Sequence, residues 1–173
     1  MYVKSVALLT LMGIAIGLFI GIFDSSLHFL DYEGVKIVNI LIFILFFAGV
    51  YWSALFFRNR IRNGLISYFG AFRNISYIGT IAAVIIAIVR YTYLTYVVKV
   101  DIGAILNQTK ESMTNRYSYY SEEIMNNRLS FIEFSYDPVV SSILYFGYYL
   151  TFTIAFAFLA SFLLRRIDRN ISL

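Results

Sequence analysis

Residues 57–79 read FRNRIRNGLISYFGAFRNISYIG and join two long apolar stretches of the chain. The segment holds four arginines, namely Arg58, Arg60, Arg62 and Arg73. A guanidinium group is costly to place in hydrocarbon, and loops rich in Lys and Arg stay on the cytoplasmic side of a membrane. We therefore expect this segment, the arginine loop, to lie at the cytoplasmic face of a bilayer and to orient the rest of the chain.

The composition also indicates a membrane protein. Of 173 residues, 60% are hydrophobic and 14% are charged, which is outside the usual range for a soluble domain. Four apolar stretches approach or exceed the roughly 20 residues that cross a bilayer, and they lack the alternation of barrel strands. We predict an all-α membrane protein with four transmembrane helices, at about 5–27, 37–57, 74–98 and 138–165. The first is longer than the apolar core of a signal peptide, so we expect it to be retained.

The charges between these helices predict the topology. Segments 24–36 and 99–137 each have a net charge of −2, whereas the other side would hold eight cations against Asp168, which leaves +7. We therefore expect cytoplasmic N- and C-termini and a single membrane domain over 1–173 with an extracytoplasmic insertion at 99–137. Capping residues at Asp101 and Ser121 predict that this insertion is a helical hairpin. Asp137 followed by Pro138 is a typical start for the fourth helix.

Small residues on two helices predict close packing. Gly13, Gly17 and Gly21 recur every four residues along one stripe of the first helix, and Gly79 opens a small patch on the third. Such stripes allow two helix backbones to approach closely in a membrane. A contact within the chain is favoured over homodimerisation, which stays open.

Two features of the third helix and its approach are candidate sites. Apolar side chains at helical spacing in 64–72 predict a short amphipathic helix in the headgroup plane, separate from the third helix. Arg90 is the one charge well inside a predicted span, in its outer part. Either Arg90 extends to the outer interface, or it faces the bundle and meets a phosphate or a carboxylate. Arg58, Arg60 and Arg62 are further candidates for lipid or phosphate contact, and we expect them to act through charge alone.

Catalytic chemistry has few candidates in this sequence. There are no cysteines and there is one histidine, His28, beside acidic residues in a short loop, which is a weak signal for a metal. Zinc-protease, phosphate-loop and serine-hydrolase motifs are absent. Glu122 and Glu123 are adjacent and would not face each other on a helix, so a charged solvated surface is favoured over an acid–base pair. We predict no catalytic residue, no cofactor and no metal.

The stretch Gly64-Leu65-Ile66-Ser67-Tyr68-Phe69-Gly70-Ala71-Phe72 resembles the bacterial family catalogued as domain of unknown function 4199. The resemblance covers most of the chain in layout, and its motif residues here are Gly64, Ile66, Ser67, Phe69, Gly70 and Phe72. This chain departs from the family pattern by an extra aromatic residue, Tyr68. The resemblance implies four membrane helices and, from the genes that accompany the family, a membrane glycosyltransferase as a partner. It implies no catalytic residue.

Because catalytic motifs are absent from the sequence and helix-packing features are present, we predict a non-enzymatic accessory or scaffold subunit of the bacterial inner membrane. Its partners would be membrane lipids and another membrane protein, or a second copy of itself, in lipid-linked sugar or envelope-lipid metabolism. Nucleic acid is not expected, because the cations cluster at helix ends. The alternative is an oligomeric translocator of lipids or small solutes, in which Arg90 would line a polar cavity with Asn39, Tyr93 or Tyr149.

Overall fold

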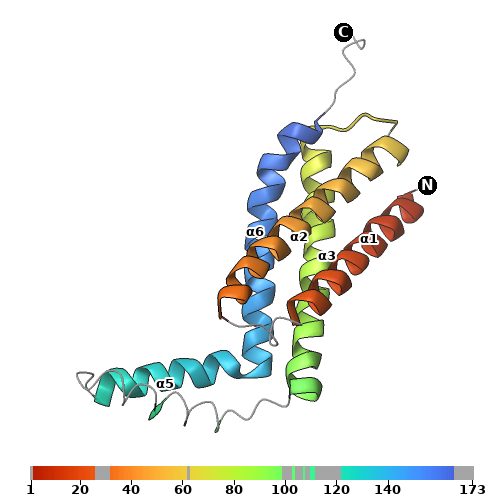
Figure 1. Ribbon diagram of the computed structural model, residues 1–173. Coiled ribbons are helices and arrows are strands. Elements are labelled where there is room, and N and C mark those ends of the chain that lie inside the picture. The colour runs from red at the N-terminus through yellow and green to blue at the C-terminus, as the bar shows by residue number, and fades with distance from the viewer. Residues whose placement is uncertain are drawn as a thin grey trace. The chain divides into compact units, whose positions relative to one another are not determined.

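The structure is a computed structural model that describes residues 2–25, 32–61, 63–98, 103, 107, 110–111 and 122–165. Every element in these residues is a helix (Figure 1). The elements are α1 (Tyr2–Ser25), α2 (Tyr32–Ile61), α3 (Tyr68–Thr92), the π-helix η2 (Tyr93–Val98), α5 (Glu122–Tyr136) and α6 (Pro138–Leu164). Four helices among the described residues are long and apolar enough to cross a membrane, as in a multi-pass membrane protein. The predicted all-helical class and its four apolar spans are confirmed.

The second and third helices extend beyond the apolar stretches that predicted them. The second helix, expected at 37–57, runs from Tyr32 to Ile61, because polar residues at its flanks continue the backbone hydrogen bonding. The third, expected at 74–98, already begins at Tyr68. A separate in-plane helix over 64–72 is therefore wrong, since Tyr68 to Phe72 form the first turn of α3.

The chain divides into two compact units. The first, the four-helix unit, comprises Met1–Val89 and Tyr145–Leu173, and the second, the α5 unit, comprises Arg90–Leu144. The α5 unit covers more residues than the insertion predicted at 99–137, because it includes the end of α3 and the start of α6. The second helix of the predicted hairpin is α5, whereas the first, together with its expected capping residue Asp101, lies almost entirely outside the described residues.

Asp137 links the two helices of the α5 unit. Its Oδ1 accepts hydrogen bonds from the N–H groups of Val139 and Val140, each at 2.9 Å, and Pro138 occupies the first helical position. Its own N–H donates to the carbonyl of Glu133 at the end of α5. The predicted cap is confirmed, and Figure 1 shows the sharp corner that the chain makes here.

The glycine stripe of α1 lies against α3. A Cβ atom added at Gly13 would lie 2.7 Å from Ile81 Cβ, and one added at Gly17 would lie 2.6 Å from Ile85 Cβ. At Gly17 the carbonyl oxygen of Ala82 would also be only 2.8 Å away. Real side chains do not approach this closely, so the seam between α1 and α3 requires glycine. The glycine stripe is therefore covered by α3 of the same chain.

The register of the seam gives the relative direction of these two helices. A step of four residues along α1, from Gly13 to Gly17, corresponds to a step of four along α3, from Ile81 to Ile85. The helices therefore run in the same direction. The Thr10 and Tyr77 hydroxyl groups, 2.9 Å apart, continue the contact toward the helix starts.

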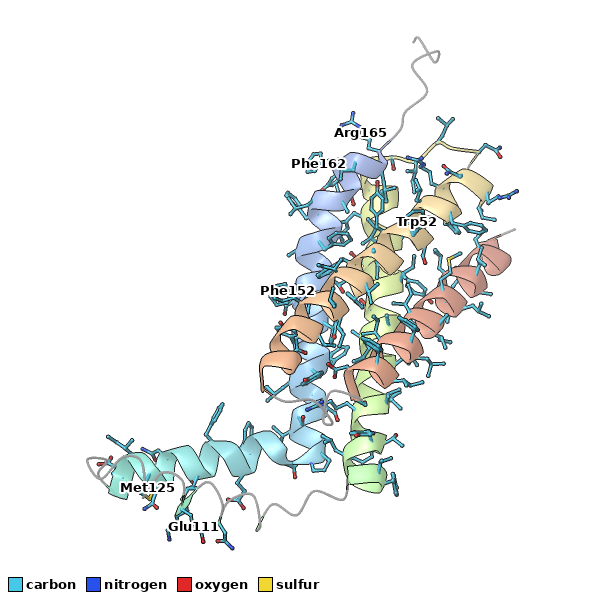
Figure 2. All side chains as sticks on the ribbon, in the orientation of Figure 1. Trp52, Glu111, Met125, Phe152, Phe162 and Arg165 are labelled. Atoms are coloured by element: carbon cyan, nitrogen blue, oxygen red, sulfur yellow. The ribbon has the colours of Figure 1, made fainter. Side chains whose placement is uncertain are left out.

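Aromatic rings join α2 to α6. Phe43 lies 5.5 Å from Phe152 and Phe47 lies 4.6 Å from Phe156, measured between ring centroids. Equal steps along both helices show that α2 and α6 also run in the same direction. These aromatic residues of α6 serve packing, although the labelled Phe152 is also partly exposed, as is Phe162 (Figure 2).

Contacts between α3 and α6 run the opposite way. Tyr68 contacts Phe158, whereas Gly79 lies against Thr153, with no room for a Cβ atom. The starts of α1 and α3 and the ends of α2 and α6 therefore lie at the same end of the four-helix unit, the upper end in Figure 1. This is the end that carries the arginine loop.

Replacing Gly17 with alanine should destabilise the four-helix unit. The added Cβ would meet the Ala82 carbonyl as well as the Ile85 side chain, and a backbone atom cannot rotate away. We expect the free energy of unfolding to fall by about 1–3 kcal/mol. The measurement is detergent-induced unfolding followed by circular dichroism.

Gly147→Ala is the matched control, because nothing lies within 4 Å of a Cβ added there. It should leave stability unchanged or slightly raised, since alanine favours helix over glycine. Equal destabilisation by the two substitutions would contradict the α1–α3 seam.

Candidate functional site

The arginine loop makes a tight reversal after α2. Asn63 and Gly64 both have positive φ angles, of 51° and 82°, in the left-handed region that glycine adopts at little cost. The N–H of Gly64 donates to the carbonyl of Arg58, 3.0 Å away, which satisfies a group in the last turn of α2. Gly64 therefore serves the turn, and a Cβ added to it would meet no neighbour within 4 Å.

Ser67 begins α3. Its Oγ accepts the N–H of Gly70 at 3.2 Å, the bond of an N-cap residue to the third helical position. Ile66 before the cap and Ala71 after it are both buried in the core, as in a hydrophobic staple. A Cβ added at Gly70 would lie 3.0 Å from Ile66 and 3.2 Å from the Ser67 hydroxyl. The motif residues Ile66, Ser67 and Gly70 therefore act together to start this helix.

Arg58 has a specific contact in addition to its charge. Its Nη1 donates to the carbonyl of Leu164, the last residue of α6, at 3.2 Å, and its Nε donates to Asn59. A cation at the C-terminus of a helix also interacts favourably with the helix dipole. Arg58 therefore joins the ends of α2 and α6 in addition to carrying a charge. Arg60 is exposed, and Arg62 lies outside the described residues.

Tyr68 joins α3 to α6 at the same end. Its hydroxyl donates to the carbonyl of Phe158 at 3.1 Å, and its ring lies 4.7 Å from that of Phe162. In the sequence Tyr68 was only a departure from a family pattern, and nothing in its spacing indicated this bond. We call the group of Arg58, Ser67, Tyr68 and Leu164 the loop end. Figure 2 labels Phe162 and Arg165 beside it.

A groove follows the outer face of α3 from the loop end. It has a volume of about 750 Å³. Its lining residues all come from α3 and its cap: Ser67, Phe69, Gly70, Phe72, Arg73, Ser76, Tyr77 and Thr80. A smaller hollow of about 200 Å³ adjoins it, with Ile66 and Asn74 in its wall. The side chain of Phe69 is 80% exposed and its ring lies 5.7 Å from that of Tyr68, whereas Phe72 is partly buried against the core.

Arg90 lies in the α5 unit. It occupies the last turn of α3, and its Nε donates to the Oγ of Ser141, a buried residue in the first turns of α6, at 3.3 Å. The α-helix then changes to the π-helix η2, which contains Tyr93. This hydrogen bond joins the end of α3 to the start of α6 within the α5 unit.

Two other residues of the translocator hypothesis, Asn39 and Tyr149, belong to the four-helix unit. Asn39 is exposed on α2, and Tyr149 is buried with its ring 4.9 Å from that of Phe46 and 5.6 Å from that of Phe43. The translocator hypothesis stays a prediction.

Acidic side chains form no recognised site in the described part of the chain. No group of three or more metal-ligating residues occurs there, and His28 lies outside it. Glu123 is exposed on α5, and the side chain of Glu122 is not among those described. Asp24, which the sequence placed in a loop, is buried near the end of α1.

Comparisons with protein families, with curated proteins and with solved structures find no match to this chain.

Replacing Arg58 with glutamine should weaken the loop end. The substitution removes the charged donor from the Leu164 carbonyl and leaves the end of α6 without its cation. We expect the free energy of unfolding in detergent to fall by about 1–2 kcal/mol, with Arg58→Lys between this variant and the wild type. Arg60→Gln, which removes a neighbouring exposed cation, should have little effect. Identical losses from Arg58→Gln and Arg60→Gln would show that only the charge matters.

Proposed function

We propose that the protein is a non-enzymatic accessory or scaffold subunit of the bacterial inner membrane, and that it packs against another membrane protein. The observation that carries this proposal is an exposed aromatic stripe on α5. The aromatic residues Phe131 and Phe134 on this helix are 68% and 55% exposed. Large exposed apolar patches on a helix outside the membrane spans typically mark interaction surfaces.

The stripe has a defined direction on the helix. Ile124 and Phe131 are seven residues apart, which is two helical turns, and Phe134 follows one turn later. Asn126 and Glu133 lie on the opposite side and are exposed and polar. With 15 residues, about 22 Å long, α5 is too short to cross a bilayer. Aromatic residues of this kind are frequent anchors in protein interfaces.

Because the helices of the four-helix unit pack against one another, a partner would contact surfaces other than their buried faces. The sequence favoured a contact within the chain for the glycine stripe of α1, and α3 covers the stripe at Gly13 and Gly17. The core between α2 and α6 is filled by aromatic rings. Aromatic packing of this kind suits a rigid scaffold.

The orientation and the partner class are part of the same proposal. We place both termini and the arginine loop in the cytoplasm and α5 outside it, because the positive charges gather at the loop end and at residues 165–169. The resemblance of 64–72 to a family that accompanies membrane glycosyltransferases supports a partner in lipid-linked sugar or envelope-lipid metabolism.

A photoreactive phenylalanine analogue at Phe131 or Phe134 should crosslink a partner protein. The reagent is introduced in the full chain at native expression level, and the crosslinked product is identified after purification in mild detergent. The same analogue at Asn126 or Glu133, on the polar side, should give little product. Phe131→Ser with Phe134→Ser should reduce partner recovery about ten-fold or more without changing the stability of the four-helix unit. Recovery of a lone monomer, or equal crosslinking from both sides of α5, would contradict the proposal.

A further inference from the structure

Arg73 lines the groove on α3 and has no counter-ion among the described residues. Arg73 lines both the 750 Å³ groove and the adjoining 200 Å³ hollow, and its side chain is exposed. It makes no hydrogen bond or ion pair with any residue in the described ranges. Arg58, by contrast, is held by the Leu164 carbonyl. A guanidinium beside two hollows is therefore available to an anion from outside the chain.

Two further polar groups in the walls have no bond of their own. Asn74 is 5% exposed, lines the smaller hollow, and forms no side-chain hydrogen bond within the described part of the chain. Ser76 lines the larger groove, and its Oγ is buried and has no hydrogen-bond partner in the described part of the chain. Unpaired buried polar groups are uncommon in proteins and are often satisfied by a bound molecule. Together with Arg73, the Asn74 amide suits an anion rich in acceptor oxygens.

The larger groove is also lined by apolar side chains. Phe69 and Phe72 flank the region of Arg73, and Thr80 lies about two turns further along α3. Inorganic phosphate would leave this wall uncovered. An amphiphile with an anionic head and a hydrocarbon chain would cover both the cation and the aromatic wall.

The length of α3 places Arg73 at the depth of lipid phosphates. The apolar span from Tyr68 to Val97 has 30 residues, which is about 45 Å, against about 30 Å for the hydrocarbon core. The excess of about 15 Å, shared between the two ends, leaves about 7 Å of helix at headgroup level. Arg73 lies five residues beyond Tyr68, about 7.5 Å along the axis, at the boundary. Ser76 and Thr80 then lie in the acyl region.

We propose that this groove binds one anionic phospholipid, with its phosphate on Arg73 and one acyl chain along Phe72, Ser76 and Thr80. The guanidinium can donate two parallel hydrogen bonds to a phosphate. Asn74 and the Ser67 hydroxyl, which accepts the Gly70 N–H and still has its own proton to donate, reach headgroup or ester oxygens. The site depends on the four-helix unit alone and not on the partner of α5.

Native mass spectrometry of the full chain in mild detergent tests the site. The probes are phosphatidylglycerol and phosphatidylcholine of the same acyl composition, added at equal concentration. We expect the wild type to retain one phosphatidylglycerol in preference to phosphatidylcholine, and Arg73→Gln to lower this retention about ten-fold. Arg60→Gln, which removes an exposed cation outside the groove, should leave the preference intact. Millimolar inorganic phosphate should not displace the lipid.

A second variant tests the acyl chain separately from the charge. Thr80→Phe fills the groove but keeps Arg73, and it should also lower phosphatidylglycerol retention. Equal retention of the two lipids by the wild type, or equal losses from Arg73→Gln and Arg60→Gln, would overturn the proposal. Displacement by inorganic phosphate would show a free-phosphate site instead. Retention unchanged in both Arg73→Gln and Thr80→Phe would exclude the groove.

Discussion

Hydrocarbon offers no hydrogen-bond partner to a peptide group, and this constraint determines the architecture of the chain. Each of the four apolar spans is a continuous helix, because only intrahelical bonds satisfy its backbone there. At the helix ends the last carbonyl groups and the first N–H groups have no intrahelical partner, so they need other hydrogen-bond partners. At the loop end these partners are side chains: Arg58 binds the carbonyl of Leu164, and Ser67 accepts the N–H of Gly70. The arginine loop therefore joins helix ends, in addition to the orientation proposed from its charge.

Packing between the spans depends on shape more than on hydrophobicity. Lipid tails are as apolar as the side chains that face them, so association in a membrane relies on close contact and on interhelical hydrogen bonds. Close contact occurs at the seam of Gly13 and Gly17, and an interhelical hydrogen bond joins Thr10 and Tyr77. Because the seam lies inside one chain, contacts with other proteins must use surfaces that the sequence pattern did not distinguish.

Structural features that depend on residues close together in the sequence were predicted well. The four spans follow from hydropathy alone, and the cap at Asp137 followed from an aspartate before a proline. The start of α3 was placed six residues too late, because cations were expected to exclude the segment from a membrane helix. A span of 30 residues reaches the headgroups and can carry Arg73 there. Contacts between distant segments, such as Tyr68 with Phe158, could not be predicted, because spacing shows that a residue can pack but not which helix it meets.

The proposed function includes a proposed orientation, with the loop end and both chain ends on the cytoplasmic side and α5 on the other. The chain contains no cysteine, so single cysteines can report on each side without background. The most direct measurement is labelling by a membrane-impermeant maleimide of Asn59→Cys, at the exposed end of α2, and of Asn126→Cys, on α5. The account predicts that position 126 reacts in intact spheroplasts and position 59 only after permeabilisation. Reaction of both positions in intact spheroplasts, or the reverse order, would contradict it.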